Sequence, residues 1–193
     1  MRRVCVFCAS SPGARPEYRA AAEEIGTELA RRHIGLVYGG GNVGLMGVVA
    51  DAALAAGCEV IGVIPKKLMA RELGHNGLTQ LHVVGSMHER KALMADLSDA
   101  FIALPGGYGT LDEFCEVLTW SQLGLHSKPC GILNVRGYYS PLLTMFDHAV
   151  DERFLKPENR ELVLAQDTAP ALLDAIERWR AVPVEKWLDR DTR

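Results

Sequence analysis

Residues 105–113, with the sequence PGGYGTLDE, combine the features of a phosphate site with a nearby carboxylate. The apolar run at residues 101–104 predicts a buried parallel strand, and the pattern after the glycines predicts a helix from about Thr110. Amides in a first helical turn point at a bound anion, and glycines let a phosphate approach them closely. Glu113 lies one turn into this helix. The stretch therefore predicts chemistry on a phosphorylated small molecule.

A second glycine turn, GGGNVG at residues 39–44, follows another apolar run at residues 35–38. It matches the G-x-G-x-x-G pattern, but a dinucleotide site also needs an acid at the carboxyl end of the next strand. Glu59 has the right spacing, yet it opens that strand. We therefore favour a nucleotide-binding loop that includes Gly40 and Gly41 without the geometry of NAD binding. A tight turn with close helix packing is the alternative.

Several candidate residues also have ordinary structural explanations when each is taken alone. Thr110 and Glu113 fit the T-x-x-E capping box, which many helices carry for stability. Arg90 and Lys91 fit a solvated helix face, and Thr119 fits a hydroxyl bonded to a carbonyl of its own helix. Only their combination favours a functional site.

The elements that must position these residues alternate along the chain. Apolar runs predict strands at residues 4–9, 35–38, 59–64, 81–84, 101–104, 131–135 and 162–165. Helical patterns fall at residues 17–32, 44–54, from Ser86, from Thr110, at 140–153 and after Thr168. Gly57 is well placed to cap the second of these helices at its C-terminus. This alternation predicts an α/β fold, a single-domain, Rossmann-like, doubly wound and mostly parallel sheet with helices on both faces. Ligands bind such sheets at the carboxyl ends of the strands, where both glycine turns lie.

Two segments lack a clear pattern. Residues 66–80 are polar, contain glycine and show no periodicity, which predicts a mobile lid over the site; Glu72 lies in it. Residues 183–193 are predicted to form a polar C-terminal tail after a single nucleotide-binding domain at residues 1–182.

The composition excludes some classes of protein. The 193 residues carry a net charge of −3, which argues against a nucleic-acid partner. The longest apolar runs are far shorter than the roughly 18 residues that a membrane span needs, so we expect no membrane association. The start Met1-Arg2-Arg3 leads directly into a strand and not into a signal sequence, so we expect a cytoplasmic protein.

The five cysteines are an odd number, which favours reduced thiols. Cys5 and Cys8 match C-x-x-C, but residues three apart in a strand point to opposite faces. We expect both to be packing residues, with no metal ion or disulfide. The six histidines show no paired ligand spacing.

The motifs taken together resemble those of the LONELY GUY (LOG) family, the cytokinin riboside 5′-monophosphate phosphoribohydrolases, often labelled lysine decarboxylases. The resemblance covers residues 4–155, and its most specific parts are the M-H-x-R-K motif at residues 87–91 and the P-G-G-x-G-T-x-x-E motif at residues 105–113. Residues 38–41, 43–47, 119–124 and 7–11 also match. Ala9 stands where the family often has glycine.

The resemblance implies a metal-free, cofactor-free enzyme that works as a homodimer or larger assembly. Its reaction cleaves the N-glycosidic bond of an N6-prenyladenosine 5′-monophosphate, and of AMP, to give the free base and ribose 5-phosphate. The catalytic pair falls on Arg90 and Glu113. The residues expected to bind the substrate are Glu72, Lys91, Gly106, Gly107, Tyr108, Gly109, Thr110, Leu111, Asp112, Thr119, Gly40, Gly41 and Ser10.

In this reaction Glu113 would stabilise the positive charge of an oxocarbenium-like ribose and orient the attacking water. The positive helix end would favour its ionised form. Arg90 offers a planar fork of donors and Lys91 a point charge, and the sequence leaves open which one anchors the phosphate. Candidates for a prenyl slot are Met87, Met94 and Trp120.

Two alternatives belong to other classes. A lysine decarboxylase would need a lysine that holds pyridoxal phosphate, and no lysine lies in a recognisable setting for that bond. A non-catalytic carrier of a nucleotide or of the molybdenum cofactor is the stronger rival, although a carrier has no need of a carboxylate beside its anion site. The sequence also leaves open whether prenylated nucleotides or AMP are the true substrate, and whether the assembly is a dimer or a hexamer.

Overall fold

The computed structural model describes residues 1–72 and 74–181, which alternate between strands and helices along the chain. The strands are β1 (Arg3–Phe7), β2 (Gly35–Tyr38), β3 (Val60–Pro65), β4 (Gln80–Val84), β5 (Ala100–Ala103), β6 (Cys130–Leu133) and β7 (Val163–Gln166). The helices are α1 (Pro16–Arg31), α2 (Gly44–Ala55), α3 (Lys66–Glu72), α4 (Met87–Asp96), α5 (Tyr108–Gln122), α6 (Ser140–Asp151), α7 (Pro157–Arg160) and α8 (Ala169–Arg178). A 3₁₀ turn, Val135–Gly137, leads into α6.

The strands form one seven-stranded sheet in the order β4-β3-β2-β1-β5-β6-β7, and every pairing is parallel. The chain builds outward from β1 in one direction as far as β4, then returns to the other side of β1 as β5. The strand order therefore reverses between β1 and β5. This is the predicted doubly wound fold, and the carboxyl ends of β1 and β5 mark the crevice where such sheets bind ligands.

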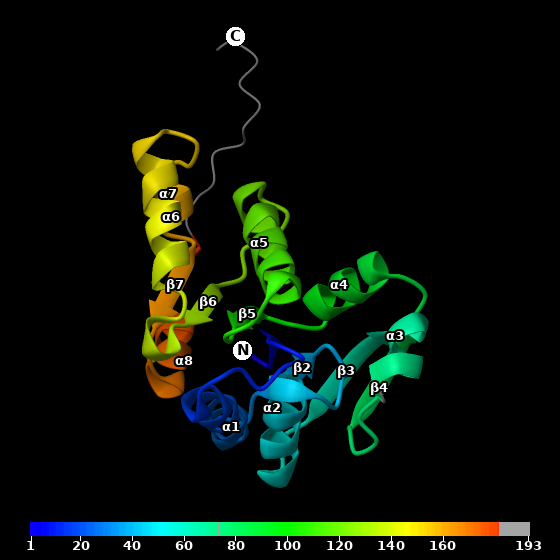
Figure 1. The fold of residues 1–193 in the computed structure, drawn as a ribbon. Coiled ribbons are helices and arrows are strands. Elements are labelled where there is room, and N and C mark those ends of the chain that lie inside the picture. The colour runs from blue at the N-terminus through cyan, green and yellow to red at the C-terminus, as the bar shows by residue number, and fades with distance from the viewer. Residues whose placement is uncertain (73, 182–193) are drawn as a thin grey trace.

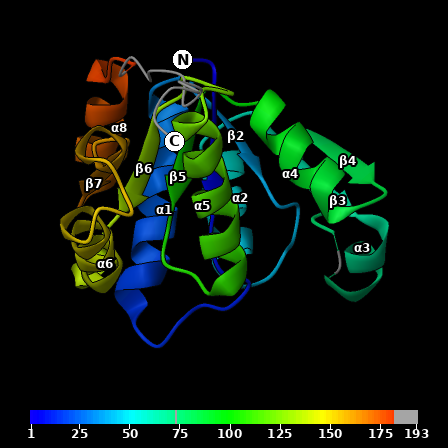
Figure 2. The same ribbon diagram turned by 90° about the horizontal axis from the view of Figure 1, so that it is seen from above.

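Helices cover both faces of the sheet because neighbouring strand residues point in opposite directions (Figures 1 and 2). In β1, Val4 and Val6 belong to the core under α1, α2 and α8, whereas Cys5 and Phe7 belong to the core under α4 and α5. Cys8, just beyond β1, returns to the first core. The prediction that Cys5 and Cys8 face opposite sides is thus confirmed.

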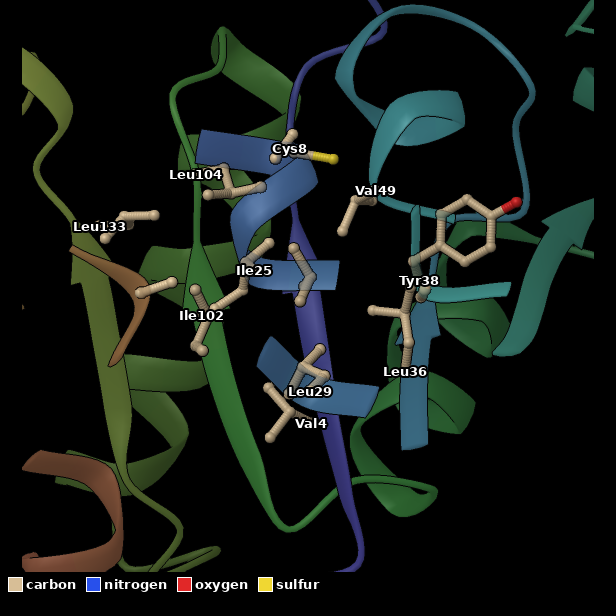
Figure 3. Close-up of a cluster of buried hydrophobic side chains, with 14 of the residues drawn as sticks. Val4, Cys8, Ile25, Leu29, Leu36, Tyr38, Val49, Ile102, Leu104 and Leu133 are labelled. Atoms are coloured by element: carbon tan, nitrogen blue, oxygen red, sulfur yellow. The ribbon is translucent and has the colours of Figure 1, made fainter. Parts of the chain in front are cut away.

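The first core is mainly aliphatic and is enclosed by the sheet and helices (Figure 3). Ile25 and Leu29 of α1 belong to the same buried cluster as Val4 of β1 and Ile102 of β5, and all four side chains are inaccessible or nearly so. Such cores contribute the main stabilising free energy of the domain and fix the strands whose ends carry the site.

The prediction that residues 66–80 lack regular structure is wrong for the first part of this segment. Its first seven residues form α3, which begins directly after β3 ends at Pro65. Leu, Met, Ala, Arg and Glu in this segment are strong helix formers, but two turns are too short to show a period. Farther along, His75 ties the segment down, because its backbone N–H donates to the Gly40 carbonyl and its Nε2 lies 2.9 Å from Asp51 Oδ1.

Two helix boundaries also differ from expectation. Helix α5 begins at Tyr108 with Gly107 as its N-cap, two residues before the predicted start at Thr110. Thr110 is therefore inside the first turn, and the predicted T-x-x-E capping box does not form. Helix α7 was not foreseen, although Pro157 at its first position is a common start signal. The predicted tail at residues 183–193 lies outside the described residues.

Two smaller expectations are confirmed. Gly57 follows the end of α2 with a φ of 81°, the left-handed conformation that suits glycine after a helix. Glu59 lies at the amino end of β3, where it pairs with Arg3 at 2.8 Å, far from the ligand crevice. Within the described part of the chain, none of the helices combines the length and apolar character needed to cross a bilayer.

Candidate functional site

A cavity of about 360 Å³ opens where the strand order reverses. The end of β1 and the loop after it form one side, and the start of α5 forms another. The residues lining the cavity are Val6, Phe7, Cys8, Ala9, Ser10, Ser11, Gly39, Met46, Leu68, Arg90, Gly107, Tyr108, Gly109, Thr110 and Glu113. Seven of the residues predicted from sequence are among them, namely Ser10, Arg90, Gly107, Tyr108, Gly109, Thr110 and Glu113.

The start of α5 presents free backbone donors to this cavity. The first helical hydrogen bond runs from the amide of Leu111 to the carbonyl of Gly107, so the amides of Tyr108, Gly109 and Thr110 point out of the helix. Its N-cap residue, Gly107, has no side chain that could cap the helix, and the first turn carries no acidic residue. The helix end therefore has the donors and the positive partial charge that a phosphate group requires.

The glycine turn before α5 needs its small residues for packing as well. A Cβ atom at Gly106 would overlap the buried side chain of Thr110, whereas one at Gly107 would meet nothing within 4 Å. Tyr138 and Tyr139 support the turn from the far side, because their hydroxyls donate to the carbonyls of Gly106 and Leu104 at 2.7 Å and 2.6 Å. Gly106 thus shapes the loop, and Gly107 leaves room for a ligand.

The loop after β1 completes the polar wall of the cavity. Ser10 and Ser11 line it, and the amide of Met46 in α2 donates to the carbonyl of Ala9. Gly44 has a φ of 59°, and a Cβ atom there would collide with the backbone of Ser10 and Ser11. Glycine at this position lets α2 begin in contact with the loop.

Arg90 reaches the cavity from α4, which Ser86 caps by accepting a hydrogen bond from the amide of Glu89 at 3.1 Å. Its side chain is buried and holds two strand ends together. Nε donates to the carbonyl of Val63 at 3.1 Å, and Nη2 donates to the carbonyl of Gly39 at 3.3 Å. The ordinary structural explanation of Arg90 as part of a solvated helix face is therefore wrong.

The remaining nitrogen of Arg90 pairs with the carboxylate of Glu113. Nη1 lies 3.4 Å from Oε1, and each side chain is 10% exposed. Burial raises the pKa of Glu113, while the charge of Arg90 opposes that rise. The expectation that the helix end would dominate and favour the ionised form is wrong, because loss of solvent has the larger effect. The result is a buried carboxylate, paired with a guanidinium, whose pKa lies above the ordinary value.

Cys8 also lines the cavity, but burial raises the pKa of its thiol well above the ordinary range. The thiol therefore stays protonated at neutral pH and is a poor nucleophile. This agrees with the prediction that it is a packing residue.

The structure places other predicted site residues outside the cavity lining. Lys91 pairs with Asp112 and Glu116 on α5, and Leu111 packs against the second core. Thr119 is exposed, and its hydroxyl donates to the carbonyl of Cys115, as its ordinary structural explanation predicted.

Gly40 and Gly41 contact the chain segment after α3 and not the cavity. The carbonyl of Gly40 accepts from the amide of His75, and Gly41 forms a β-bridge with Gly74. Their neighbour Gly39 lines the cavity instead. The side chain of Glu72 lies outside the described part of the structure.

The apolar wall of the cavity comes from residues that the sequence did not single out. Met46 of α2 and Leu68 of α3 line it. Met94, one of the predicted prenyl-slot residues, is only 1% exposed in the second core, and Trp120 packs against that core. Met87 is exposed beside Arg90, with its sulfur 4.0 Å from Nη1. The helical spacing of apolar residues does not tell whether a methionine lies in the core or lines the cavity.

Comparisons with known proteins identify the family of this chain. A family model described as "Possible lysine decarboxylase" matches residues 46–176. Cytokinin riboside 5′-monophosphate phosphoribohydrolase LOG3 of Arabidopsis thaliana is 53% identical over 178 residues, which are 92% of this chain and 83% of that protein. The chain belongs to the LOG family. A rice relative from Oryza sativa subsp. japonica, the probable phosphoribohydrolase LOGL9, is 55% identical and covers 95% of this chain and 80% of its own.

Solved structures share the fold of this LOG family member at lower identity. The molybdenum cofactor carrier protein of Chlamydomonas reinhardtii has a TM-score of 0.69 and 20% identity, covering 91% of this chain and 96% of its own. The molybdenum cofactor binding protein of Rippkaea orientalis has a TM-score of 0.69 and 23% identity, covering 92% and 96%. At these identities the likeness shows the common fold alone.

The description of the family model as a lysine decarboxylase implies pyridoxal phosphate, which is held through a lysine. Among the described residues, the cavity lining includes no lysine. Lys91 is engaged with two carboxylates, and the ammonium of Lys128 donates to the carbonyl of Ala95 at 2.8 Å. The residues present do not fit that cofactor.

Proposed function

We propose that this LOG family member hydrolyses the N-glycosidic bond of N6-prenyladenosine 5′-monophosphate, and of AMP, to the free base and ribose 5-phosphate. The observation that carries the proposal is the buried Arg90–Glu113 pair in a cavity beside the free amides of α5. Relatives that carry the name phosphoribohydrolase and are more than half identical support the same reaction.

The phosphate group is assigned to the start of α5. The amides of Tyr108, Gly109 and Thr110 supply donors, and Ser10 and Ser11 add hydroxyls from the opposite side of the cavity. A 5′-phosphate at this point directs its ribose towards Glu113, which lies one helical turn farther on.

Glu113 is assigned as the catalytic carboxylate. As the bond between C1′ and the base nitrogen breaks, positive charge grows on the ribose, and a carboxylate in a poorly hydrated cavity stabilises it strongly. The oxygen of a water molecule forms the new bond to C1′. Glu113 accepts one proton from that water and returns it for the departing base. Arg90 fixes the position of the carboxylate and balances its charge during the cycle.

The base is assigned to the apolar side of the cavity. Met46 and Leu68 offer the surface on which an adenine with a prenyl group at N6 would lose contact with water. Leu68 comes from α3, so this short helix would contribute to substrate preference as well as to enclosure.

Chromatographic product analysis tests the proposed reaction directly. Purified protein is incubated with AMP and, separately, with isopentenyladenosine 5′-monophosphate, and free base and ribose 5-phosphate are quantified. The proposal expects both products in equal amounts and a higher kcat/KM for the prenylated nucleotide. Tight AMP binding without base release would instead favour a carrier of nucleotides.

We also propose that two copies associate through the surface formed by α5, α6 and α7. No residue of α6 is fully buried in the single chain, although half of its residues are apolar. A groove of about 250 Å³ between these helices is lined mainly by apolar side chains, including Phe146 and Phe154. Phe154 is 88% exposed, and Leu125 at the end of the same surface is 71% exposed. A second copy would cover this surface.

Sedimentation velocity separates the possible assemblies. A dimer is expected for the native chain and a monomer for Phe154→Asp, because a charge in the groove would lose its water on association. Phe154 is far from being buried in the single chain, so the variant should keep its fold by circular dichroism. A native monomer at micromolar concentration would contradict the proposal.

A further inference from the structure

Two consecutive tyrosines, Tyr138 and Tyr139, reach the glycine turn before α5 from the turn that leads into α6. The hydroxyl of Tyr138 donates to the carbonyl of Gly106 at 2.7 Å, and the hydroxyl of Tyr139 donates to the carbonyl of Leu104 at 2.6 Å. Neither tyrosine is among the residues that line the cavity. Both hydroxyls therefore act on the backbone of the turn and not on the surface that a substrate would contact.

The ring of Tyr138 is held on two sides. It packs edge-on against Tyr18 of α1, with ring centroids 5.7 Å apart, and against Tyr139, with centroids 5.0 Å apart. Such edge-to-face contacts between aromatic rings are favourable and directional. The turn that carries both tyrosines is fixed as well, because the backbone amide of Tyr139 donates to Asn134 Oδ1 at 2.8 Å. The Tyr138 hydroxyl thus has a defined position beside the glycine turn.

The two hydrogen bonds differ in what lies on the other side of the peptide unit. In a trans peptide unit the carbonyl and the N–H point in opposite directions. The unit that begins with the Gly106 carbonyl ends with the N–H of Gly107, which lines the cavity and for which the described residues supply no acceptor. The unit that begins with the Leu104 carbonyl ends with the nitrogen of Pro105, which has no hydrogen. The first hydrogen bond therefore orients a free donor, and the second does not.

The direction of this peptide unit matters for an anion in the cavity. Gly106 and Gly107 have no side chains that would resist a rotation of the unit between them. A rotated unit would present a carbonyl oxygen, which repels a phosphate, whereas the observed unit presents an N–H next to the free amides of α5. The hydroxyl of Tyr138 favours the observed direction because it gives the carbonyl a donor on the far side of the turn.

We infer that Tyr138 is a positioning residue, whose hydroxyl holds the peptide between Gly106 and Gly107 so that the Gly107 N–H becomes a donor to the substrate phosphate. The inference rests on the proposed function, which assigns the phosphate to the start of α5. It adds the N–H of Gly107 to the amides already assigned and names the side chain that orients it.

The same substitution at both tyrosines separates positioning from support of the fold. Tyr138→Phe and Tyr139→Phe each remove one hydroxyl and keep the ring. We expect Tyr138→Phe to raise the dissociation constant of inorganic phosphate and the KM for AMP about fivefold or more, with kcat within about threefold of the native value. Calorimetry and base-release kinetics measure these constants, and circular dichroism checks the fold.

Tyr139→Phe is the matched control. It leaves the buried Leu104 carbonyl without its donor and should lower the midpoint of thermal unfolding, but both constants should stay within about twofold of the native values. An unchanged phosphate dissociation constant in Tyr138→Phe overturns the inference. An equal rise in Tyr139→Phe also overturns it, because the two hydroxyls would then act through the stability of the turn alone.

Amide NMR tests the inference without turnover. Titration of the native protein with inorganic phosphate should move the amide proton of Gly107 downfield, together with those of Tyr108 and Gly109. At the same fractional saturation of Tyr138→Phe, the shift of Gly107 should shrink by about half or more, because its N–H loses a fixed direction. A Gly107 amide that phosphate does not move in the native protein overturns the inference. Absence of base release from AMP would refute the proposed function, while the phosphate titration would still report on Tyr138.

Discussion

The guanidinium of Arg90 lies 3.4 Å from the carboxylate of Glu113, and this buried pair joins α4 to α5 at the reversal point of the sheet. The same guanidinium donates to the carbonyls of Val63 and Gly39, at the ends of β3 and β2. One side chain thus connects α4, β3 and the turn after β2 to the carboxylate that we propose as catalytic.

Replacement of Arg90 by Gln or Lys should damage both stability and turnover. Neither side chain can serve two buried carbonyls and a buried carboxylate at once as the guanidinium does, and breaking a buried pair typically costs about 3–5 kcal/mol in unfolding free energy. We expect kcat to fall about 10²–10³-fold as well. Urea unfolding and base-release kinetics measure the two effects, with Arg19→Gln as an exposed control that should change stability by less than about 1 kcal/mol. Native stability and kcat in Arg90→Lys would show that the fork geometry is unimportant.

The raised pKa of Glu113 should appear in both activity and stability. Its folded-state pKa lies above the unfolded value, so its stabilising contribution is complete below the unfolded value and is lost as the pH rises through the folded value. Activity needs the ionised form, so kcat should rise over the same pH interval. The acidic limb of the pH profile of kcat should therefore lie above the ordinary pKa range of glutamate.

Unfolding free energies from about pH 4 to pH 8 measure this linkage in the native protein and in Glu113→Gln. The difference between the two should change through the same interval as kcat. Two results together would show that burial does not raise the pKa of this carboxylate. The unfolding free energies of the two proteins would depend on pH in the same way, and the acidic limb of kcat would lie at or below the ordinary glutamate pKa.

Two neighbouring glycines should respond differently to alanine. Gly106→Ala places a methyl group against buried Thr110 and should destabilise the fold by about 1–3 kcal/mol. Gly107 has an ordinary φ of −94° and open space around its Cβ position, so Gly107→Ala should keep the fold and raise KM about tenfold by obstructing the phosphate. Thermal unfolding and KM for AMP measure the contrast. Equal stability losses, or an unchanged KM in Gly107→Ala, would argue against the assigned phosphate position.

Leu68→Ala should weaken the preference for a prenylated base. The change removes apolar contact worth about 0.8 kcal/mol per methylene, so the ratio of kcat/KM between isopentenyladenosine 5′-monophosphate and AMP should fall about tenfold. Met69→Ala changes the next residue of α3, which is 40% exposed and does not line the cavity, and should leave the ratio unchanged. An equal fall with both substrates would place the prenyl group elsewhere.

The strands and most helices could be predicted because their signals are local. Apolar runs marked each described strand of the sheet to within about two residues, and Gly57 marked the end of α2. Parallel order followed from the alternation of strands and helices. Helix α3 was not predicted because seven residues are too few to show helical periodicity, although its residue types favour a helix.

Site residues could be predicted where they belong to a local sequence motif. Their contacts and burial could not be predicted where these depend on tertiary packing. Glu113 and the amides near Gly107 follow from a glycine turn before a helix. The environment of Lys91 depends on how α4 docks on α5, and the core position of Met94 depends on the rotation of α4 against the sheet. The raised pKa of Glu113 likewise requires knowledge of its burial, which no local pattern contains.

The most direct test of the central claim is the single-turnover rate of base release from AMP by the native protein and by Glu113→Gln, with AMP affinity measured by calorimetry on the same samples. We expect the variant to bind AMP within about threefold of the native affinity, since the amides of α5 hold the phosphate. We expect base release to slow about 10²–10³-fold, since the carboxylate acts on the transition state. A variant that binds AMP and releases base at the native rate would contradict the assignment of Glu113 as the catalytic carboxylate.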